Sequence, residues 1–349
     1  MNVRLIYNHI EHHAAHSGYD QLAKYVTAKP YTKGHFWRWA EKHRSEWEAE
    51  LKQVPTDATN WYWGDAIPRE VAIAKRMRTL PLRTLFHFFY AENDLRYVSL
   101  QQKRLNNKVV ASFHQPPEFL DRHVEDKSYI RGLDAAVVMA EFQKDYMEQF
   151  LPRERIFCVP HGVDIDHWKP DPGIDRWDIP TFVFVGFWLR DVEMACQTIR
   201  RVAELGIEAR FRIVTFAERR KYFEDLPQTE LLSGIPDEQL LEEYRKAWAL
   251  FLPLELSTAN NVVLEAMSCG TGVVSTRIGG TPEYVSDDAG LLVTPKDIDE
   301  AAEAIRTVCD DRDKTEAMGR AARERALVYD WRKMGALQDD CYRKVLKGI

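Results

Sequence analysis

The sequence is poor in cysteine. Five cysteines are spread over 349 residues, and no two of them form a CxxC motif. Their spacing excludes a zinc-ribbon pattern and argues against a disulfide framework. A chain of this kind fits the reducing environment of the cytoplasm.

The sequence also lacks an excess of positive charge and long apolar runs. The formal net charge is −6, whereas a nucleic-acid-binding protein normally carries a strongly basic face. No apolar run approaches the roughly 20 residues of a membrane span. The first residues, MNVRLIY, lack the apolar core of a signal peptide. We therefore expect a cytoplasmic protein with no nucleic-acid partner.

Histidine is absent from the second half, because all eleven histidines lie between His9 and His167. The length of 349 residues exceeds what a single hydrophobic core usually serves, which predicts two domains. The alternation of short apolar runs with amphipathic stretches is typical of βαβ units in a parallel sheet. The sequence thus predicts an α/β protein with two doubly wound, Rossmann-like domains.

The expected elements follow from this alternation. In the first half they are strands at 3–7, 84–89, 108–113, 135–139 and 155–159, with helices at 19–26, 69–77 and 141–150. In the second half they are strands at 181–185, 211–215, 249–252, 272–275 and 290–293, with helices at 192–205, 237–246, 262–269, 298–309 and 314–327. A stretch rich in Pro, Gly and Asp predicts a linker. The expected boundaries are 1–164 for the first domain, 165–180 for the linker, 181–330 for the second domain, and 331–349 for a last helix that packs back on the first domain.

Tryptophan is concentrated in one segment. Five of the ten tryptophans lie between positions 34 and 65, interleaved with Arg38, Lys42, His43 and Arg44. Two interpretations stay open. The aromatic side chains either pack on the first domain or form a surface for an acceptor or a membrane, where Trp beside Lys and Arg is common.

The most informative segment is LFLPLELSTANNVVLEAMSCG, at 250–270. An apolar strand leads into a polar loop and then into a helix, for which Ser257, Thr258 and Asn260 are good N-cap residues. The N–H groups at such a helix start suit a phosphate. Glu265 follows about one turn later and, as a carboxylate, suits sugar hydroxyls better than phosphate oxygens. A capped structural helix with a solvated Glu265 is the alternative.

The next segment, at 272–285, contains Gly279-Gly280 followed by Thr-Pro-Glu283. Together with Glu265-Ala-Met-Ser-Cys-Gly270, it closely resembles the donor-site motif of GT-B glycosyltransferases of the retaining GT4 (group 1) type. Further resemblances occur in the expected order at 111–116 (ASFHQP), 159–164 (VPHGVD), 184–191 (FVGFWLRD) and 235–247. The resemblance is strong from 159 to 293 and thin before residue 80.

The resemblance implies two domains that face a central cleft and an enzyme that moves a sugar from a nucleoside diphosphate to an acceptor hydroxyl. Glu265 then holds the ribose, and His114, at a strand end, contacts a hydroxyl of the donor sugar or helps to orient the reacting phosphate. Assigned to the donor are Gly18, Gly186, Arg190, Ser257, Thr258, Asn260, Asn261, Val262 and Glu265, and assigned to catalysis are His114 and Glu265. The acceptor is a saccharide, a lipid-linked or a small molecule, bound by the histidine-rich half, with membrane contact through 34–65 as an option.

The sequence departs from the family pattern at two places. Ser257 stands where the family commonly has a sugar-contacting Glu, and Glu255 replaces that Glu only if the loop slips by two residues. Phe187 stands where an Arg often binds phosphate, so we expect Arg190 to take over. A Lys common in this loop has no clear counterpart. A non-catalytic nucleotide-sugar-binding protein and another GT-B enzyme, such as an epimerase, therefore stay as alternatives.

We expect no metal and no cofactor. His12 and His16 have the i,i+4 spacing of a helical metal pair, but the sequence supplies no HExxH motif. Two DxD motifs, at 164–166 and 297–299, lie in the expected linker and at an expected helix start, where Asp is an ordinary cap. In the family that this sequence resembles, a helix dipole and an Arg stabilise the leaving diphosphate instead.

Overall fold

The computed structural model describes residues 2–7, 15–31, 42–43, 45, 66–79, 83–101 and 106–348. The chain divides into two compact units. Unit 1 comprises Met1–His12, Tyr19–Pro160 and Arg332–Ile349, and unit 2 comprises His13–Gly18 and His161–Trp331. The tryptophan-rich interval 34–65 lies almost entirely outside the described residues, and so do His9, His12 and His13.

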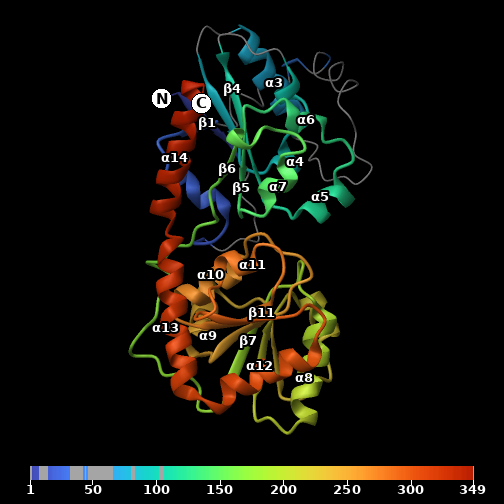
Figure 1. Cartoon of the computed structure of the whole chain (residues 1–349), viewed down its shortest axis with the longest axis vertical. Helices are drawn as coiled ribbons and strands as arrows, with labels where there is room; N and C mark the ends of the chain where they lie inside the picture. The colour runs from blue at the N-terminus through green and yellow to red at the C-terminus, as the bar shows by residue number, and fades with distance from the viewer. Residues whose placement is uncertain are drawn as a thin grey trace. The chain divides into compact units, whose positions relative to one another are not determined.

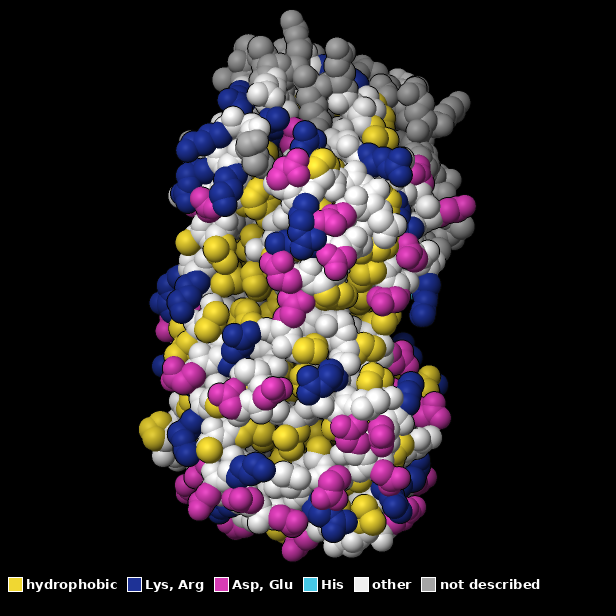
Figure 2. Space-filling view, in the orientation of Figure 1, with side chains coloured by type: hydrophobic (Ala, Val, Ile, Leu, Met, Phe, Trp, Pro, Cys, Tyr) yellow, Lys and Arg dark blue, Asp and Glu magenta, His cyan; other side chains and the backbone are white. Residues whose placement is uncertain are grey.

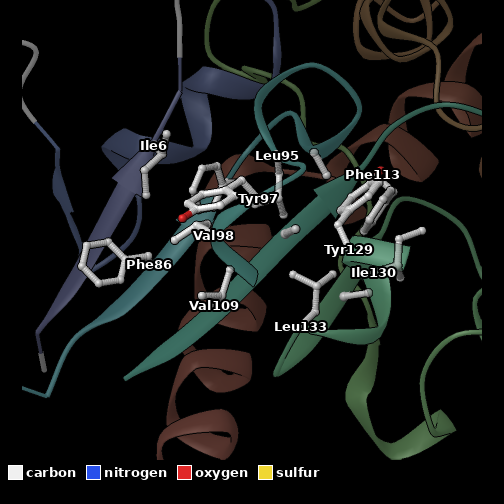
Figure 3. Packing of buried hydrophobic residues seen from close by; sticks show 14 of the residues in the cluster. Ile6, Phe86, Leu95, Tyr97, Val98, Val109, Phe113, Tyr129, Ile130 and Leu133 are labelled. Atoms are coloured by element: carbon white, nitrogen blue, oxygen red, sulfur yellow. The ribbon is translucent and has the colours of Figure 1, made fainter. Parts of the chain in front are cut away.

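Unit 1 is built on a parallel sheet with the strand order β2-β1-β3-β4-β5-β6. The strands are β1 (Val3–Ile6), β2 (Lys29–Pro30), β3 (Leu85–Phe88), β4 (Lys108–Phe113), β5 (Ala135–Val138) and β6 (Ile156–Cys158). The residues of β3, β4 and β5 are almost all buried and, apart from His87 in β3 and Lys108 and Ser112 in β4, apolar, as expected for strands covered on both faces. Figure 3 shows Phe86 and Val109 from neighbouring strands among the residues that pack with Tyr97 and Val98 in this core.

The remaining elements of unit 1 are mostly short. They are η1 (Tyr19–Lys24), α3 (Ala66–Thr79), α4 (Ala91–Asp94), η2 (Val98–Leu100), α5 (Pro117–His123), α6 (Ser128–Arg131), α7 (Gln143–Met147), η4 (Arg153–Arg155) and α14 (Trp331–Lys347). Figure 1 shows α14 beside β1, and this helix contributes Tyr342 to the unit. The hydroxyl of Tyr342 lies 2.6 Å from Nδ1 of His87, whose Nε2 lies 2.8 Å from Oγ of Ser112. Burial, with a contribution from His114, lowers the pKa of His87 to about 3, so its ring is neutral.

Unit 2 is a second parallel sheet with the order β12-β11-β10-β7-β8-β9. Its strands are β7 (Thr181–Val185), β8 (Arg210–Val214), β9 (Thr229–Leu232), β10 (Ala249–Leu252), β11 (Gly272–Thr276) and β12 (Gly290–Val293). The chain order reverses between β7 and β10, which places a topological switch point beyond the carboxyl ends of these strands. This edge is where a ligand site is expected.

Helices cover both faces of the second sheet. They are α8 (Val192–Glu204), η5 (Ala217–Tyr222), α9 (Asp237–Lys246), α10 (Asn261–Ser268), α11 (Thr281–Tyr284), α12 (Ile298–Asp310) and α13 (Arg312–Val328). Figure 1 shows α9, α10 and α13 on one side and α8 and α12 on the other. The prediction of an α/β protein with two parallel, doubly wound sheets is therefore confirmed.

Some elements differ from the expectation. The stretch expected as a helix at 19–26 is the 3-10 helix η1, and the strands β2 and β9 were not predicted. The expected linker, 165–180, belongs to unit 2: Trp168 is fully buried, and Arg176 donates to the carbonyls of Trp248 (2.9 Å) and Gly270 (2.8 Å). The assignment of domains from the sequence otherwise stays a prediction.

The visible surface carries charges of both signs. Figure 2 shows Lys and Arg interspersed with Asp and Glu, in keeping with the net charge of −6. Among the described residues, none of the helices is long and apolar enough to cross a membrane.

Candidate functional site

The loops after β7 and β10 are joined by backbone hydrogen bonds at the switch point of unit 2. The amide of Glu255 donates to the carbonyl of Leu189 (3.0 Å), and the amide of Asp191 donates to that of Pro253 (2.9 Å). Arg190 and Leu254 form an isolated antiparallel bridge. The two loops therefore act as one support for the side chains that they carry.

Gly186 and Arg190 lie together in the first of these loops. Gly186 has φ +88°, and a Cβ there would approach Nη2 of Arg190 to 3.1 Å, so glycine is needed at this position. The Arg190 guanidinium donates to the carbonyls of Val185 (3.2 Å) and Trp188 (2.9 Å). Burial lowers the pKa of Arg190 to about 10, while Tyr244 and Glu265 oppose this shift. The guanidinium thus stays a cation and is attracted by the charge of Glu265.

The second loop leads into the start of α10. Asn260 is the N-cap residue, and its side chain accepts a hydrogen bond from the amide of Val262 (3.1 Å). Ser257 and Thr258 are buried, whereas Asn260, Asn261 and Val262 are partly exposed. The amide of Gly280 donates to the Ser257 carbonyl (3.1 Å), which ties the Gly-Gly turn to this loop. The helix start therefore presents amide groups beside a fixed polar loop.

Glu265 lies one turn into α10 and is only 5% exposed. Its Oε1 accepts a hydrogen bond from the hydroxyl of Ser17, and its Oε2 accepts one from the hydroxyl of Tyr244 (3.0 Å). Burial raises the pKa of Glu265 to about 7, although these two hydrogen bonds and Arg190 oppose the shift. Glu265 is therefore not the solvated carboxylate of the alternative interpretation.

Ser17 belongs to a short N-terminal segment that is part of unit 2. The amide of Ala15 donates to Oδ2 of Asp237 (3.2 Å), and Nδ1 of His16 lies 2.7 Å from Oδ2 of Asp164. The His16 ring stacks on the ring of His167 with centroids 3.8 Å apart. Gly18, the expected phosphate-binding residue, follows with φ +93° and is buried.

His114 lies in unit 1, directly after β4, which is the strand-end position predicted from the sequence. Its ring packs against those of Tyr19 and Tyr90, with centroid distances of 4.5 and 5.0 Å. Glu92, 2% exposed, accepts hydrogen bonds from the amides of His114 and Gln115 and lies 3.8 Å from His114 Nδ1. Burial disfavours the charge on Glu92, but the interaction with the His114 side chain, together with the smaller effect of the Gln115 amide, outweighs it and lowers the pKa of Glu92.

The structure brings Gly186, Arg190, Ser257, Thr258, Asn260, Asn261, Val262 and Glu265 to one edge of unit 2. Gly18 belongs to this unit as well, whereas His114 belongs to unit 1. The two possible substitutes for the missing Glu differ, because Ser257 is buried and Glu255 is exposed. Within the part of the chain that the structure describes, no group of three or more His, Cys, Asp or Glu is placed to hold a metal ion.

Three residues of this region were not assigned a role from the sequence. Ser17 and Tyr244 supply the two hydroxyl groups on Glu265. Lys296, with φ +67°, places Nζ 2.6 Å from Oδ2 of Asp191, and this ion pair, with further attraction from Glu255, raises the pKa of Lys296. A cation thus reaches this loop from the β12–α12 connection. The positive φ of a non-glycine residue cannot be read from the sequence.

Comparison with known proteins identifies this region. Residues 182–325 match the family described as "Glycosyl transferases group 1". This part of the chain is therefore similar to group 1 glycosyltransferases. D-inositol 3-phosphate glycosyltransferase of Saccharomonospora viridis is 34% identical over 273 residues, which are 70% of this chain and 63% of the relative. Sulfoquinovosyl transferase SQD2 of Arabidopsis thaliana is 34% identical over 153 residues, which are 40% of this chain and 29% of the relative.

The chain spans less than two thirds of the length of these curated relatives. Among solved structures, Anabaena HepE in complex with UDP matches with a TM-score of 0.66 at 14% identity, and each chain is covered completely. Sucrose-phosphate synthase from Thermosynechococcus elongatus matches with a TM-score of 0.63 at 19% identity and covers 81% of this chain and 78% of its own. The predicted GT-B fold class is therefore confirmed.

Proposed function

We propose that the chain is a retaining glycosyltransferase that moves a sugar from a nucleoside diphosphate to an acceptor hydroxyl. The observation that carries the proposal is the buried carboxylate of Glu265, which accepts hydrogen bonds from two hydroxyl groups. Glu265 lies one turn into α10, and the start of this helix is partly exposed. Glu265, Tyr244 and the start of α10 lie within the residues that match the group 1 glycosyltransferase family, whereas Ser17 lies outside them.

Each part of a nucleotide sugar has a proposed partner. The diphosphate binds the start of α10, the backbone at Gly18 and Gly186, and the Arg190 guanidinium, because amides at a helix start and a nearby cation favour an anion. A ribose hydroxyl binds Glu265. The sugar binds the loop from Ser257 to Val262, and His114 contacts one of its hydroxyls.

The proposed reaction needs no enzymic nucleophile. The bond between the anomeric carbon and the diphosphate oxygen breaks, and the acceptor oxygen forms its bond on the same face. The acceptor proton passes to the departing phosphate oxygen. Arg190 and the helix start stabilise the negative charge that develops on the leaving group.

We propose that this reaction requires neither a metal nor a cofactor, because cationic and dipolar groups of the chain take the charge of the leaving group. The test is transfer activity after dialysis against EDTA. Unchanged activity is expected. Loss of activity that returns with Mg²⁺ or Mn²⁺ would contradict metal independence and leave glycosyl transfer intact.

The acceptor is proposed from the relatives. One relative is named a D-inositol 3-phosphate glycosyltransferase, so a phosphorylated polyol belongs in an acceptor panel. A saccharide and a lipid-linked acceptor, which the sequence analysis leaves open, complete the panel. Membrane contact through residues 34–65 and a location at the inner face of a membrane stay predictions. Sedimentation with anionic liposomes tests them, and absence of binding would contradict membrane contact.

The decisive experiment has two stages. A thermal-shift screen against nucleoside diphosphate sugars identifies the donor, because a ligand raises the apparent stability according to its affinity. Proton NMR of the transfer product then gives the anomeric configuration, which should equal that of the donor. An inverted product would contradict retention, and donor binding without turnover on the whole panel would favour the non-catalytic alternative that Ser257 keeps open. Conversion of the donor sugar to its epimer would favour an epimerase.

A further inference from the structure

Both oxygens of the Glu265 carboxylate are occupied by hydroxyl groups of the chain itself. Ser17 donates to Oε1 and Tyr244 donates to Oε2. Two hydroxyl donors on two carboxylate oxygens are also what a vicinal diol, such as that of ribose, presents to a carboxylate. The group that should receive a nucleotide is therefore already engaged in the ligand-free protein.

The two donors differ in how firmly they are held. Tyr244 is fully buried on α9, its ring packs edge-on against Trp168 with centroids 5.7 Å apart, and Thr271 donates to its carbonyl (2.6 Å). Ser17 is half-buried on a segment without regular secondary structure. Replacing Tyr244 would open the core, whereas replacing Ser17 moves only a surface segment.

The segment that carries Ser17 is anchored independently of Glu265. The amide of Ala15 bonds Asp237, and His16 bonds Asp164 and stacks on His167. These contacts keep the Ser17 hydroxyl close to Oε1, so it competes for that oxygen at a high local concentration.

We propose that Ser17 sets the nucleotide affinity of this site: its hydroxyl occupies Oε1 of Glu265 in the free protein, and a ribose hydroxyl must displace it. Tyr244 is a positioning residue that stays on Oε2 and orients the carboxylate. This inference rests on the proposed function, because it takes Glu265 as the ribose-binding group.

The two hydroxyls should then act in opposite directions. Ser17→Ala removes the competitor and should tighten binding by about fivefold to tenfold, since a hydrogen bond to a charged group no longer has to be broken. Tyr244→Phe removes the orienting bond and should weaken binding by about fivefold. If both residues had a purely structural role, both substitutions would weaken nucleotide binding.

The test is isothermal titration calorimetry with UDP, GDP and ADP in turn. Ser17→Thr keeps the hydroxyl and should bind as the unmodified protein does. Ser286→Ala is the matched control, because Ser286 also donates to a carboxylate, Asp288 (2.6 Å), but precedes β12 at the opposite edge of the sheet. The titration is then repeated with the 2′-deoxy and 3′-deoxy forms of the nucleotide that binds. The gain in affinity from Ser17→Ala should vanish for the form that lacks the hydroxyl that displaces Ser17.

The outcomes separate the two proposals. In one outcome, Ser17→Ala binds the nucleotide no more tightly than the unmodified protein, while Glu265→Ala still weakens binding. This result overturns the role of Ser17 and leaves the proposed function standing. No binding of any of the three nucleotides by either protein overturns both. Circular dichroism of each variant checks that it is folded.

Discussion

Each unit contains a buried glutamate at the carboxyl end of its sheet, and the two differ in what holds them. Glu92 of unit 1 accepts hydrogen bonds from the amides of His114 and Gln115 and faces the His114 ring. Glu265 of unit 2 accepts from the hydroxyls of Ser17 and Tyr244. The pKa of Glu92 is lowered and the pKa of Glu265 is raised, although both carboxylates are almost fully buried.

The difference separates a structural carboxylate from one that suits a ligand. Burial would raise the pKa of Glu92, but the His114 side chain and, to a smaller extent, the backbone amide of Gln115 outweigh it and stabilise the charge. Hydroxyl groups stabilise the charge on Glu265 less, and one of them can be replaced by a hydroxyl of another molecule. Burial alone therefore does not identify a binding carboxylate, whereas the chemical type of its donors does.

The pH dependence of stability should have opposite signs for the two residues. The pKa of Glu265 is raised from 4.5 to about 7, so its contribution is full below pH 4.5 and is lost as pH rises through about 7. The loss should be about 3 kcal/mol. The pKa of Glu92 is lowered, so its contribution is present above pH 4.5 and is lost as pH falls below that value.

Urea unfolding between pH 3 and pH 8 measures both effects. Glu265→Gln should remove the decline between pH 4.5 and 7, and Glu92→Gln should remove part of the decline below pH 4.5. If both substitutions removed the decline in stability over the same pH range, the predicted opposite pH dependence of the two carboxylates would be wrong.

Removal of the Glu265 carboxylate should abolish most nucleotide affinity. We expect Glu265→Ala to weaken nucleoside diphosphate binding by about 100-fold, because a charge-assisted hydrogen bond to ribose is lost. Calorimetry measures this change, and circular dichroism checks that the variant is folded, because Ala removes the acceptor of the buried Tyr244 hydroxyl. Unchanged affinity would contradict the site, and Glu255→Ala, which removes an exposed carboxylate of the same loop, is the control.

Removal of the Glu92 carboxylate should instead lower stability. We expect Glu92→Ala to destabilise the fold by about 2 kcal/mol, because the amides of His114 and Gln115 lose their acceptor. Denaturant unfolding measures this, with the exposed Glu118→Ala as control. Nucleotide affinity should stay within about twofold. A variant as stable as the control would show that water replaces the carboxylate.

The smallest expected effect concerns Arg190. Arg190→Lys keeps the positive charge but loses the planar group that donates to Val185 and Trp188, so diphosphate affinity should fall by about tenfold. The nucleoside without phosphates should bind equally well to both proteins. Arg220→Lys, on η5, is the matched control. An equal loss for the nucleoside would place Arg190 outside the phosphate site.

Much of the fold could be predicted because buried parallel strands are continuous apolar runs. This holds for β7 (TFVFV) and β10 (ALFL), whose residues are all buried. The edge strand β9 (TELL) was missed because Glu230 is exposed and no apolar run marks it. The segment of η1 has helical periodicity, but its tight 3-10 turn depends on the packing of Tyr19 and Leu22.

The site was predictable where it is local in the sequence. Asn260 is the cap and Glu265 lies one turn later, as the loop sequence indicates. The contact of Ser17 with Glu265 joins residues 248 positions apart, and Tyr244 reaches the same carboxylate from another helix. Such contacts depend on the tertiary fold, so no spacing in the sequence reports them.

The assignment of residues 13–18 to unit 2 has a consequence for work with isolated fragments. A polypeptide that begins at His161 and ends at Trp331 would contain the whole second sheet, the loops and Glu265, but it would lack Ser17 and His16. Water would then fill the place of the serine hydroxyl. Because the fragment would lose the competing hydroxyl of Ser17 together with the proposed diphosphate contact at Gly18, nucleotide affinities measured on it would not report on Ser17 alone.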